Sequence, residues 1–225
     1  MSADAARTLD EEAETQVQAA SIVLKLRGLG ISDRAVLKAI ETVPRTLFVP
    51  ADLQHHAYSD HALPVDCGQM ISAPSLVALV TSALDVSDRH AVLEIGTGTG
   101  YQTAILARLA RRVTTIERFR TLSRAAEARF QALGIRNISA IVGDGMLGWR
   151  RQAPFDRILV SAACPEPPVK LITQLTDTGI LIAPIGAGEG EQRLTLFQRI
   201  GQSVDTRDLG PVRFLPVVPG PARSL

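Results

Sequence analysis

Three glycines at alternate positions follow an apolar run near the middle of the chain. They are Gly96, Gly98 and Gly100, within the sequence AVLEIGTGTGY that begins at Ala91. Apolar residues at helical spacing come next, so this order predicts a strand, a tight turn and a helix. Glycine permits positive φ and close approach to a ligand, and the N-terminus of a helix offers free N–H groups. The stretch therefore predicts a cofactor-binding turn.

The spacing of these glycines excludes the two most familiar glycine-rich loops. The dinucleotide fingerprint needs glycine at its first, third and sixth positions, but the sixth position here is Tyr101 or Thr103, depending on the register. A phosphate-binding P-loop needs a Gly-Lys pair, which the chain lacks. What remains is a carboxylate, Glu94, at the end of the predicted strand. A negative charge there opposes a pyrophosphate and suits a ligand with cationic groups.

S-adenosylmethionine is a ligand of this kind, because it carries an ammonium, a sulfonium and a ribose diol. A second apolar stretch, residues 113–117, predicts a strand that ends in Glu117, 21 positions after Gly96. An acidic residue about 20 positions after the turn binds ribose hydroxyls in nucleotide-binding βαβ units. The residues thus indicate S-adenosylmethionine as the cofactor and Glu117 as its ribose ligand.

Composition limits the class of protein. The 225 residues suit one domain, and a net charge of +1 creates no basic field that would attract nucleic acid. Cys67 and Cys164 lie far apart without a CxxC pair, so we expect neither a disulfide framework nor a metal site. No basic-then-apolar leader and no membrane-length apolar run occur. We therefore expect a cytoplasmic protein with no nucleic-acid or membrane partner.

Helical and strand patterns alternate along most of the chain, which predicts a doubly wound, mostly parallel α/β sheet of about seven strands behind an N-terminal helical extension. Residues 1–15 are small, polar and acidic, and we expect a disordered tail there. Residues 16–225 are expected to form one domain, with helices and substrate loops over 16–90 and the cofactor-binding sheet and C-terminal strands over 91–225. After the glycine strand, further strands are expected at 113–117, 138–142, 155–161, 179–185, 192–199 and 212–217.

Four further segments resemble protein-L-isoaspartate O-methyltransferases, a family of class I S-adenosylmethionine-dependent methyltransferases. They are VPRTLFVP from Val43, LPVDCGQMISAP from Leu63, GDGMLGW with APFDRILVS from Gly143 and Ala153, and QLTDTGILIAPIG from Gln174. The resemblance implies methylation of the free α-carboxyl of L-isoaspartyl residues in damaged proteins and peptides. Repair then proceeds through a succinimide, and the cofactor leaves as S-adenosyl-L-homocysteine.

The same resemblance implies roles for individual residues. Ser72 is similar to the family's active-site serine, which is both catalytic and substrate-binding, and Gln192 resembles a residue near the substrate loops. The implied cofactor site comprises Gln69, Met70, Ile71, Glu94, Gly96, Thr97, Gly98, Gly100, Glu117, Arg118, Asp144 and Gly145. In that set the first three residues lie between cofactor and substrate, and the last two form the adenine site.

This chemistry needs no strong base and no metal. A carboxylic acid with a pKa of about 4 is already ionised at neutral pH, and the sulfonium is an activated donor. The rate should come from proximity and alignment, with the Ser72 hydroxyl orienting the carboxylate by hydrogen bonding.

Met70 departs from the family pattern. Bacterial relatives usually have GQTIS where this chain has GQMIS, so a thioether, which donates no hydrogen bond, replaces a hydroxyl. Two alternatives stay open, and Met70 supports only the first. One is methylation of an ordinary aspartyl residue or another peptide carboxylate, and the other is a cofactor-binding protein without catalysis.

We expect the protein to be a monomer.

Overall fold

The computed structural model describes residues 3–188 and 190–222, with side chains from residue 15 onward. Its helices are α1 (Ala3–Gly28), α2 (Arg34–Thr42), α3 (Pro74–Leu84), α4 (Tyr101–Leu109), α5 (Arg120–Ala132) and α6 (Val169–Ile172). Four 3-10 helices are η1 (Arg45–Phe48), η2 (Ala51–His56), η3 (Asp66–Gly68) and η4 (Gly145–Leu147). The strands are β1 (Leu63–Val65), β2 (Gln69–Ile71), β3 (Ala91–Ile95), β4 (Arg112–Glu117), β5 (Ile138–Val142), β6 (Phe155–Val160), β7 (Leu175–Ile185), β8 (Gln192–Ile200) and β9 (Ser203–Val212).

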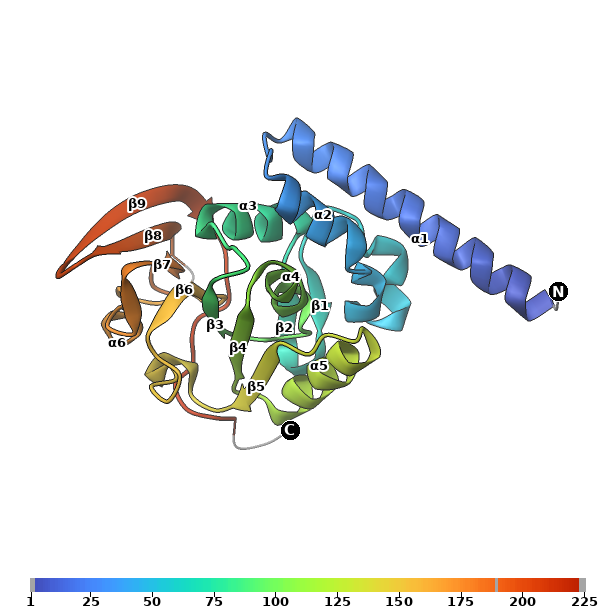
Figure 1. The fold of residues 1–225 in the computed structure, drawn as a ribbon. Coiled ribbons are helices and arrows are strands. Elements are labelled where there is room, and N and C mark those ends of the chain that lie inside the picture. The colour runs from blue at the N-terminus through green and yellow to red at the C-terminus, as the bar shows by residue number, and fades with distance from the viewer. Residues whose placement is uncertain (1–2, 189, 223–225) are drawn as a thin grey trace.

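A twisted sheet forms the centre of the molecule (Figure 1). Within the described residues it has seven strands in the order β5-β4-β3-β6-β7-β8-β9. The first five in this order pair in parallel, whereas β8 and β9 are antiparallel. The predicted doubly wound, mostly parallel sheet is therefore confirmed. A separate antiparallel hairpin, β1 with β2, lies before it in the sequence.

Alternate residues of the central strands pack on opposite faces of the sheet. Leu93 of β3 belongs to a buried cluster that includes Leu171 of α6. Its neighbour Val92 belongs to a different cluster, which contains Leu84 of α3 and Leu106 of α4. Because side chains of a strand alternate between faces, helices must cover the sheet on both sides, and they do so here.

The N-terminal extension packs against this body through the second half of α1 and through α2. Asp33 caps α2, since its Oδ1 accepts hydrogen bonds from the N–H groups of Ala35 and Val36 at 2.9 and 3.1 Å. The α1 backbone is helical from Ala3, whereas the sequence analysis expected a disordered tail up to residue 15. Alanine, glutamate and arginine are good helix formers, so a polar composition did not exclude a helix; residues 1 and 2 lie outside the described part. Figure 1 shows α1 extending beyond the body towards its N-terminus.

The last strand lies earlier in the chain than its sequence predicts. The apolar pattern predicts a strand over residues 212–217, but β9 covers Ser203–Val212 and pairs antiparallel with β8. After β9, Pro216 forms an isolated parallel bridge with Ala163. The sequence of β9 is polar and mostly exposed, as is common on an edge strand, so the search for apolar runs missed it. The sequence also predicts a helix over residues 169–175, whereas α6 ends at Ile172 and β7 begins at Leu175, earlier than the predicted residue 179.

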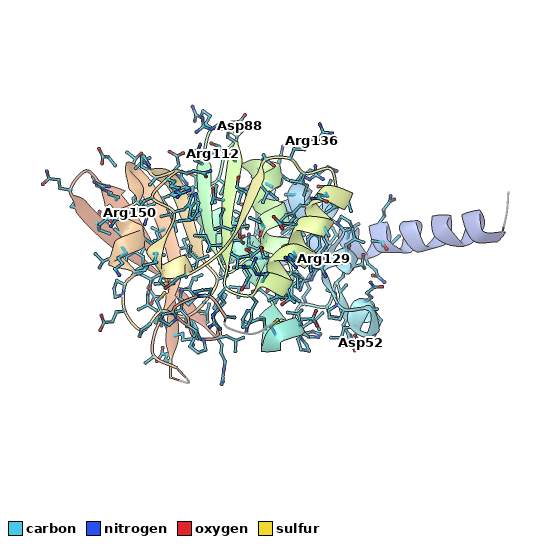
Figure 2. The ribbon with its side chains drawn as sticks, turned by 90° about the horizontal axis from the view of Figure 1, so that it is seen from below. Asp52, Asp88, Arg112, Arg129, Arg136 and Arg150 are labelled. Atoms are coloured by element: carbon cyan, nitrogen blue, oxygen red, sulfur yellow. The ribbon has the colours of Figure 1, made fainter. Side chains whose placement is uncertain are left out.

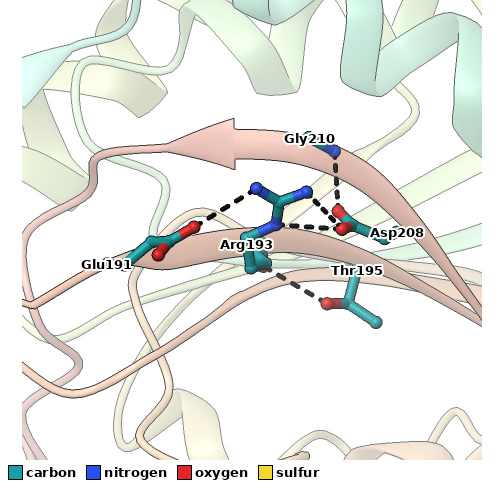
Figure 3. A network of polar contacts seen from close by, with 5 residues as sticks. All are labelled: Glu191, Arg193, Thr195, Asp208 and Gly210. Carbon is teal, nitrogen blue, oxygen red and sulfur yellow. Dashed lines mark hydrogen bonds and ion pairs between the residues drawn. The ribbon is translucent and has the colours of Figure 1, made fainter.

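Exposed charges join β8 to β9 near their bulge. The Arg193 guanidinium donates to Asp208 from Nε at 2.9 Å and from Nη2, and it donates to Glu191 Oε1 at 3.3 Å (Figure 3). The N–H of Gly210 donates to the same aspartate at 2.8 Å. Exposed pairs of this kind contribute little stability, so we assign the network to the hairpin and not to the functional site.

Among the described residues no helix is long and apolar enough to cross a membrane.

Candidate active site

A cavity of about 490 Å³ opens where β3, β4, β5 and β6 end. Several parts of the chain line it, among them residues 69–73 at β2, residues 95–99, 101 and 102 around the glycine turn, residues 116–118 at the end of β4, residues 144–145 after β5, and residues 213–218, which we call the C-terminal strap. The carboxyl ends of parallel strands are where doubly wound sheets bind ligands. A cavity of this size suits a small-molecule ligand.

The glycine turn has the backbone that its sequence predicts. Gly96, Gly98 and Gly100 have φ of 92°, 55° and 93°, in the left-handed region that favours glycine. A Cβ on Gly100 would also lie 2.7 Å from Cε1 of Phe130 on α5. This glycine does not line the cavity. It lets the chain enter α4 beneath the turn.

Two carboxylates of the cofactor prediction line the cavity. The oxygens of Glu117, at the end of β4, accept hydrogen bonds from the N–H groups of Gly98 at 2.8 Å and Phe119 at 3.0 Å. Asp144, after β5, accepts one at 2.9 Å from the N–H of Met146. A carboxylate offers about four acceptor sites, so both keep capacity for a ligand. Their acceptors suit the hydroxyls of a ribose and the amino group of an adenine.

Glu94 is the main departure from the predicted site. Its side chain is fully buried and does not line the cavity. One oxygen, Oε2, accepts hydrogen bonds from the hydroxyls of Thr103 on α4 and Thr115 on β4. Burial raises the pKa of Glu94 to about 7, while the two threonine hydroxyls act in the opposite direction.

The threonine hydroxyls connect Glu94 to the glycine turn. The Oγ1 atoms of Thr97 and Thr115 lie 2.6 Å apart. Since a hydroxyl has one proton and Thr115 donates it to Glu94, Thr97 must be the donor in that pair. Glu94 therefore supports the turn from below. The prediction that it contacts a ligand with cationic groups does not fit its position, because its side chain is buried and does not line the cavity.

The segment that carries Ser72 is a short hairpin. In its antiparallel register, Pro64 pairs with Met70 and Val65 with Gln69. Ser72 follows β2 directly and lines both the main cavity and a small neighbouring one of about 20 Å³, which Phe214 of the strap also lines. Met70 is 44% exposed at the cavity. The hairpin thus brings Ser72 towards the strap, on the side of the cavity that Met70 borders.

Gln192 holds the strap and does not line the cavity. Its side chain is 2% exposed; Oε1 accepts from the N–H of Phe214 at 2.7 Å, and Nε2 donates to the carbonyl of the same residue at 3.0 Å. The strap is also bonded to Ala163, which donates to Leu215 O at 2.9 Å and accepts from Val217 N at 2.8 Å. Gln192 was predicted near the substrate, and its contact with the cavity is indirect.

The structure brings most of the predicted residues together. Those that line the cavity are Gln69, Met70, Ile71, Ser72, Gly96, Thr97, Gly98, Glu117, Arg118, Asp144 and Gly145. Glu94, Gly100 and Gln192 lie outside it, each supporting a segment that lines it. The Arg118 guanidinium lies 4.8 Å from the Phe119 ring and donates to Gly220 O at 3.3 Å.

Sequence reasoning missed the strap, Tyr101 and Arg45. Tyr101 was placed only as the start of a helix, yet its side chain is buried and lines the cavity. The strap was expected as a strand, and its approach to the cavity depends on the return of the β8–β9 hairpin. Arg45 is buried and donates a hydrogen bond to the carbonyl oxygen of Ser72. The sequence indicates it only through the segment VPRTLFVP, which resembles the family.

Comparison with known proteins agrees with this geometry. The sequence model of the family described as "Protein-L-isoaspartate(D-aspartate) O-methyltransferase (PCMT)" matches residues 17–222. A protein-L-isoaspartate O-methyltransferase of Maricaulis maris is 53% identical over 204 residues, which are 91% of this chain and 95% of the relative. Another, of Azorhizobium caulinodans, is 51% identical over 216 residues, or 96% and 99%.

Solved structures have the same fold. A protein-L-isoaspartate O-methyltransferase matches with a TM-score of 0.79 and 28% identity, over 88% of this chain and 65% of that one. A putative member from Plasmodium falciparum, solved in complex with S-adenosyl-L-homocysteine, matches with a TM-score of 0.76 over 88% and 97% of the two chains. Its 23% identity supports the fold alone. On the family match and the close relatives together, the chain belongs to the protein-L-isoaspartate(D-aspartate) O-methyltransferase family.

Proposed function

We infer that this protein is an S-adenosylmethionine-dependent methyltransferase that esterifies the free α-carboxyl of L-isoaspartyl residues in damaged proteins and peptides. The observation that carries this conclusion is that the Ser72 segment, the glycine turn and Glu117 at the end of β4 line one cavity. A substrate carboxylate and a cofactor can meet there.

The residues of the cavity fit the cofactor. Glu117 would bind the ribose hydroxyls, Asp144 the adenine, and the turn at Gly96 and Gly98 the amino-acid part. An added Cβ on Gly145 would overlap Ile95, so this part of the cavity wall requires a glycine. When bound, the cofactor supplies an activated methyl group on its sulfonium, and its product is S-adenosyl-L-homocysteine.

Ser72 acts as a positioning donor for the substrate in this proposal. Its hydroxyl donates a hydrogen bond to one oxygen of the substrate carboxylate and leaves the other free as the nucleophile. The carboxylate is ionised at neutral pH, so no residue of the chain has to remove a proton. Holding the reacting groups in line can supply several kcal/mol of the barrier reduction. The ester then closes to a succinimide without the enzyme, which begins the repair.

The first test measures turnover of Ser72→Ala on an isoaspartyl peptide. A hydrogen bond to a charged group is worth about 1.5–3 kcal/mol, so we expect turnover to fall by roughly 10- to 100-fold while the affinity for S-adenosyl-L-homocysteine stays within about twofold. Ser139→Ala, at an exposed serine of β5 outside the cavity, is the matched control. Unchanged turnover of the Ser72 variant would remove this residue from the mechanism.

A second assay separates this function from its two rivals. The wild-type protein is incubated with radiolabelled S-adenosylmethionine and matched isoaspartyl and aspartyl peptides. Base-labile methyl ester on the isoaspartyl peptide alone supports the inference. Ester on the aspartyl peptide supports the alternative in which an ordinary aspartyl residue is methylated. Cofactor binding without any ester supports a non-catalytic cofactor-binding protein.

We further propose that the enzyme acts as a monomer in the cytoplasm. Cys67 and Cys164 are both free thiols, which suits a reducing compartment. Sedimentation of the purified protein and fractionation of the source cells would test these two points.

A further inference from the structure

Arg45 in η1 is a fully buried arginine. Buried charges are normally paired with a carboxylate, but none of the ion pairs found in the described part of the chain includes this guanidinium. Its contacts are with backbone carbonyls and an aromatic ring instead. Burying a cation without a carboxylate partner costs free energy of folding. We therefore expect the contacts of Arg45 to serve the function of the protein.

The contacts of Arg45 join two parts of the proposed active site. Nη2 donates to the carbonyl oxygen of Ser72 at 2.7 Å, and Nε donates to that of Ala57, also at 2.7 Å. The guanidinium carbon lies 4.7 Å from the centroid of the Tyr101 ring. Tyr101 is the first residue of α4, immediately after the glycine turn, and it lines the cavity. One side chain therefore contacts both the Ser72 segment and the helix that begins at the cofactor turn.

The segment that carries Arg45 is held in place from its other side. Arg129 of α5, labelled in Figure 2, donates from Nε to Leu47 O at 2.8 Å and from Nη1 to Thr99 O at 3.2 Å. Thr99 belongs to the glycine turn, so η1 is linked to that turn independently of Arg45. The backbone N–H of Arg45 also donates to the hydroxyl of Tyr58 at 3.2 Å. Arg45 thus extends from a fixed base.

Arginine suits this position better than lysine would. Its planar guanidinium donates in two directions at once and stacks on an aromatic face, whereas an ammonium is a compact point charge. A lysine at position 45 ends in a single nitrogen, so it lacks the separate Nε and Nη2 donors that bind Ala57 O and Ser72 O while the guanidinium lies over the Tyr101 ring.

We propose that Arg45 is a positioning residue that sets the place of Ser72 relative to the cofactor turn. By holding the Ser72 carbonyl inward, it directs the Ser72 hydroxyl towards the cavity. The inference rests on the proposed function, in which that hydroxyl orients the substrate carboxylate. A misplacement of about 1 Å can reduce the rate by 10²-fold, so the contact should affect turnover more than cofactor affinity. Arg45 itself does not line the cavity.

Arg157 offers a matched control for a purely structural role. It is also buried, at 8% exposed, and its Nε donates to the carbonyls of Leu84 and Asp85 at 2.6 and 3.0 Å. These bonds join β6 to the end of α3, and Arg157 does not line the cavity. Arg→Lys at either position replaces a buried guanidinium and removes its hydrogen bonds to backbone carbonyls. Of the two arginines, Arg45 contacts the Ser72 segment and Arg157 does not.

The experiment compares Arg45→Lys with Arg157→Lys at a temperature well below the melting temperature of both variants. We expect Arg45→Lys to lower kcat on an isoaspartyl peptide by about tenfold or more, with the Kd for S-adenosyl-L-homocysteine within about twofold of wild type. Arg157→Lys should lower the melting temperature and keep the wild-type kcat. Equal kcat in Arg45→Lys and wild type, or an equal loss in both variants, would overturn the proposal.

Tyr58→Phe tests the positioning of Ser72 by Arg45 with less risk to folding. It removes only the acceptor of the Arg45 N–H, and we expect kcat to fall by about two- to tenfold at unchanged cofactor affinity. If Arg45→Lys does not fold, this variant decides the matter, and a wild-type kcat would refute the role of Arg45. Failure of the proposed function is a separate result, because the wild-type protein would then form no ester on the isoaspartyl peptide.

Discussion

Glu94 shows how a correct residue can have a different role from the one its sequence context indicates. The position of this carboxylate next to a glycine turn predicts a partner for a cationic ligand. In the structure it is buried under the turn and accepts hydrogen bonds from Thr103 and Thr115. The side-chain alternation of β3 directs Ile95 to the cavity and Glu94 to the opposite face.

The buried carboxyl makes stability depend on pH in a direction unusual for an acidic residue. Burial raises the pKa of Glu94 from 4.5 to about 7, so the folded protein binds a proton more tightly than the unfolded chain. This contribution is fully present below about pH 4.5 and is lost as the pH rises through about 7. The change corresponds to roughly 3 kcal/mol.

Glu94→Gln removes this titration. We expect the free energy of unfolding of wild type, measured with urea, to fall between pH 5 and pH 8 by roughly 3 kcal/mol more than that of the variant. All other titrating groups are shared, so the difference between the two pH profiles isolates Glu94. Parallel profiles would show that its pKa is not raised.

At the scale of elements, the cavity depends on a segment with little regular structure of its own. The strap at residues 213–218 is bound to the loop after β6 through Ala163 and to β8 through Gln192. Its position is therefore set by side-chain and backbone bonds to other elements and not by membership of a long strand.

Gln192→Ala should loosen the strap. It leaves the N–H and C=O of Phe214 without their partner, at a cost of about 1–3 kcal/mol for each buried group. We expect faster hydrogen exchange at residues 214–218 and a lower kcat/KM on an isoaspartyl peptide. Gln198→Ala, at an exposed glutamine on the same strand, is the control and should match wild type. Unaltered exchange in the Gln192 variant would mean that Ala163 alone holds the strap.

At the scale of the whole molecule, the cavity joins segments from the N-terminal, central and C-terminal parts of the chain. A ligand that contacts all three should stabilise the entire fold. The charged groups of Figure 2 at Asp88 and Arg112 lie at one edge of the molecule, and Asp52 lies at the opposite side. None of these three residues lines the cavity.

S-adenosyl-L-homocysteine should raise the melting temperature in proportion to the logarithm of its concentration. At 100 times its Kd the stabilisation should be about 2.7 kcal/mol, measured by calorimetry. A dinucleotide such as NAD should produce no shift, because the spacing of the glycines does not fit the turn that binds its pyrophosphate. A shift with NAD and none with S-adenosyl-L-homocysteine would contradict the assignment of the cofactor.

The sequence by itself determined the periodic elements and the local turn chemistry. The strand, glycine turn and helix around Gly96 follow from local backbone preferences and apolar spacing, and residue order carries both. The separation of Glu117 from the turn follows from one βαβ unit, so it too is a local property. The Ser72 segment was identified by resemblance to the family.

Only the tertiary structure decided which side chains reach the cavity. The burial of Glu94, the approach of the strap and the contact of Arg45 with Ser72 each join residues from different elements. Ser72 lies 27 positions after Arg45 in the chain, and no periodic pattern records such a contact. These arrangements depend on how packed layers orient their side chains, which is a property of the assembled core and not of any one segment.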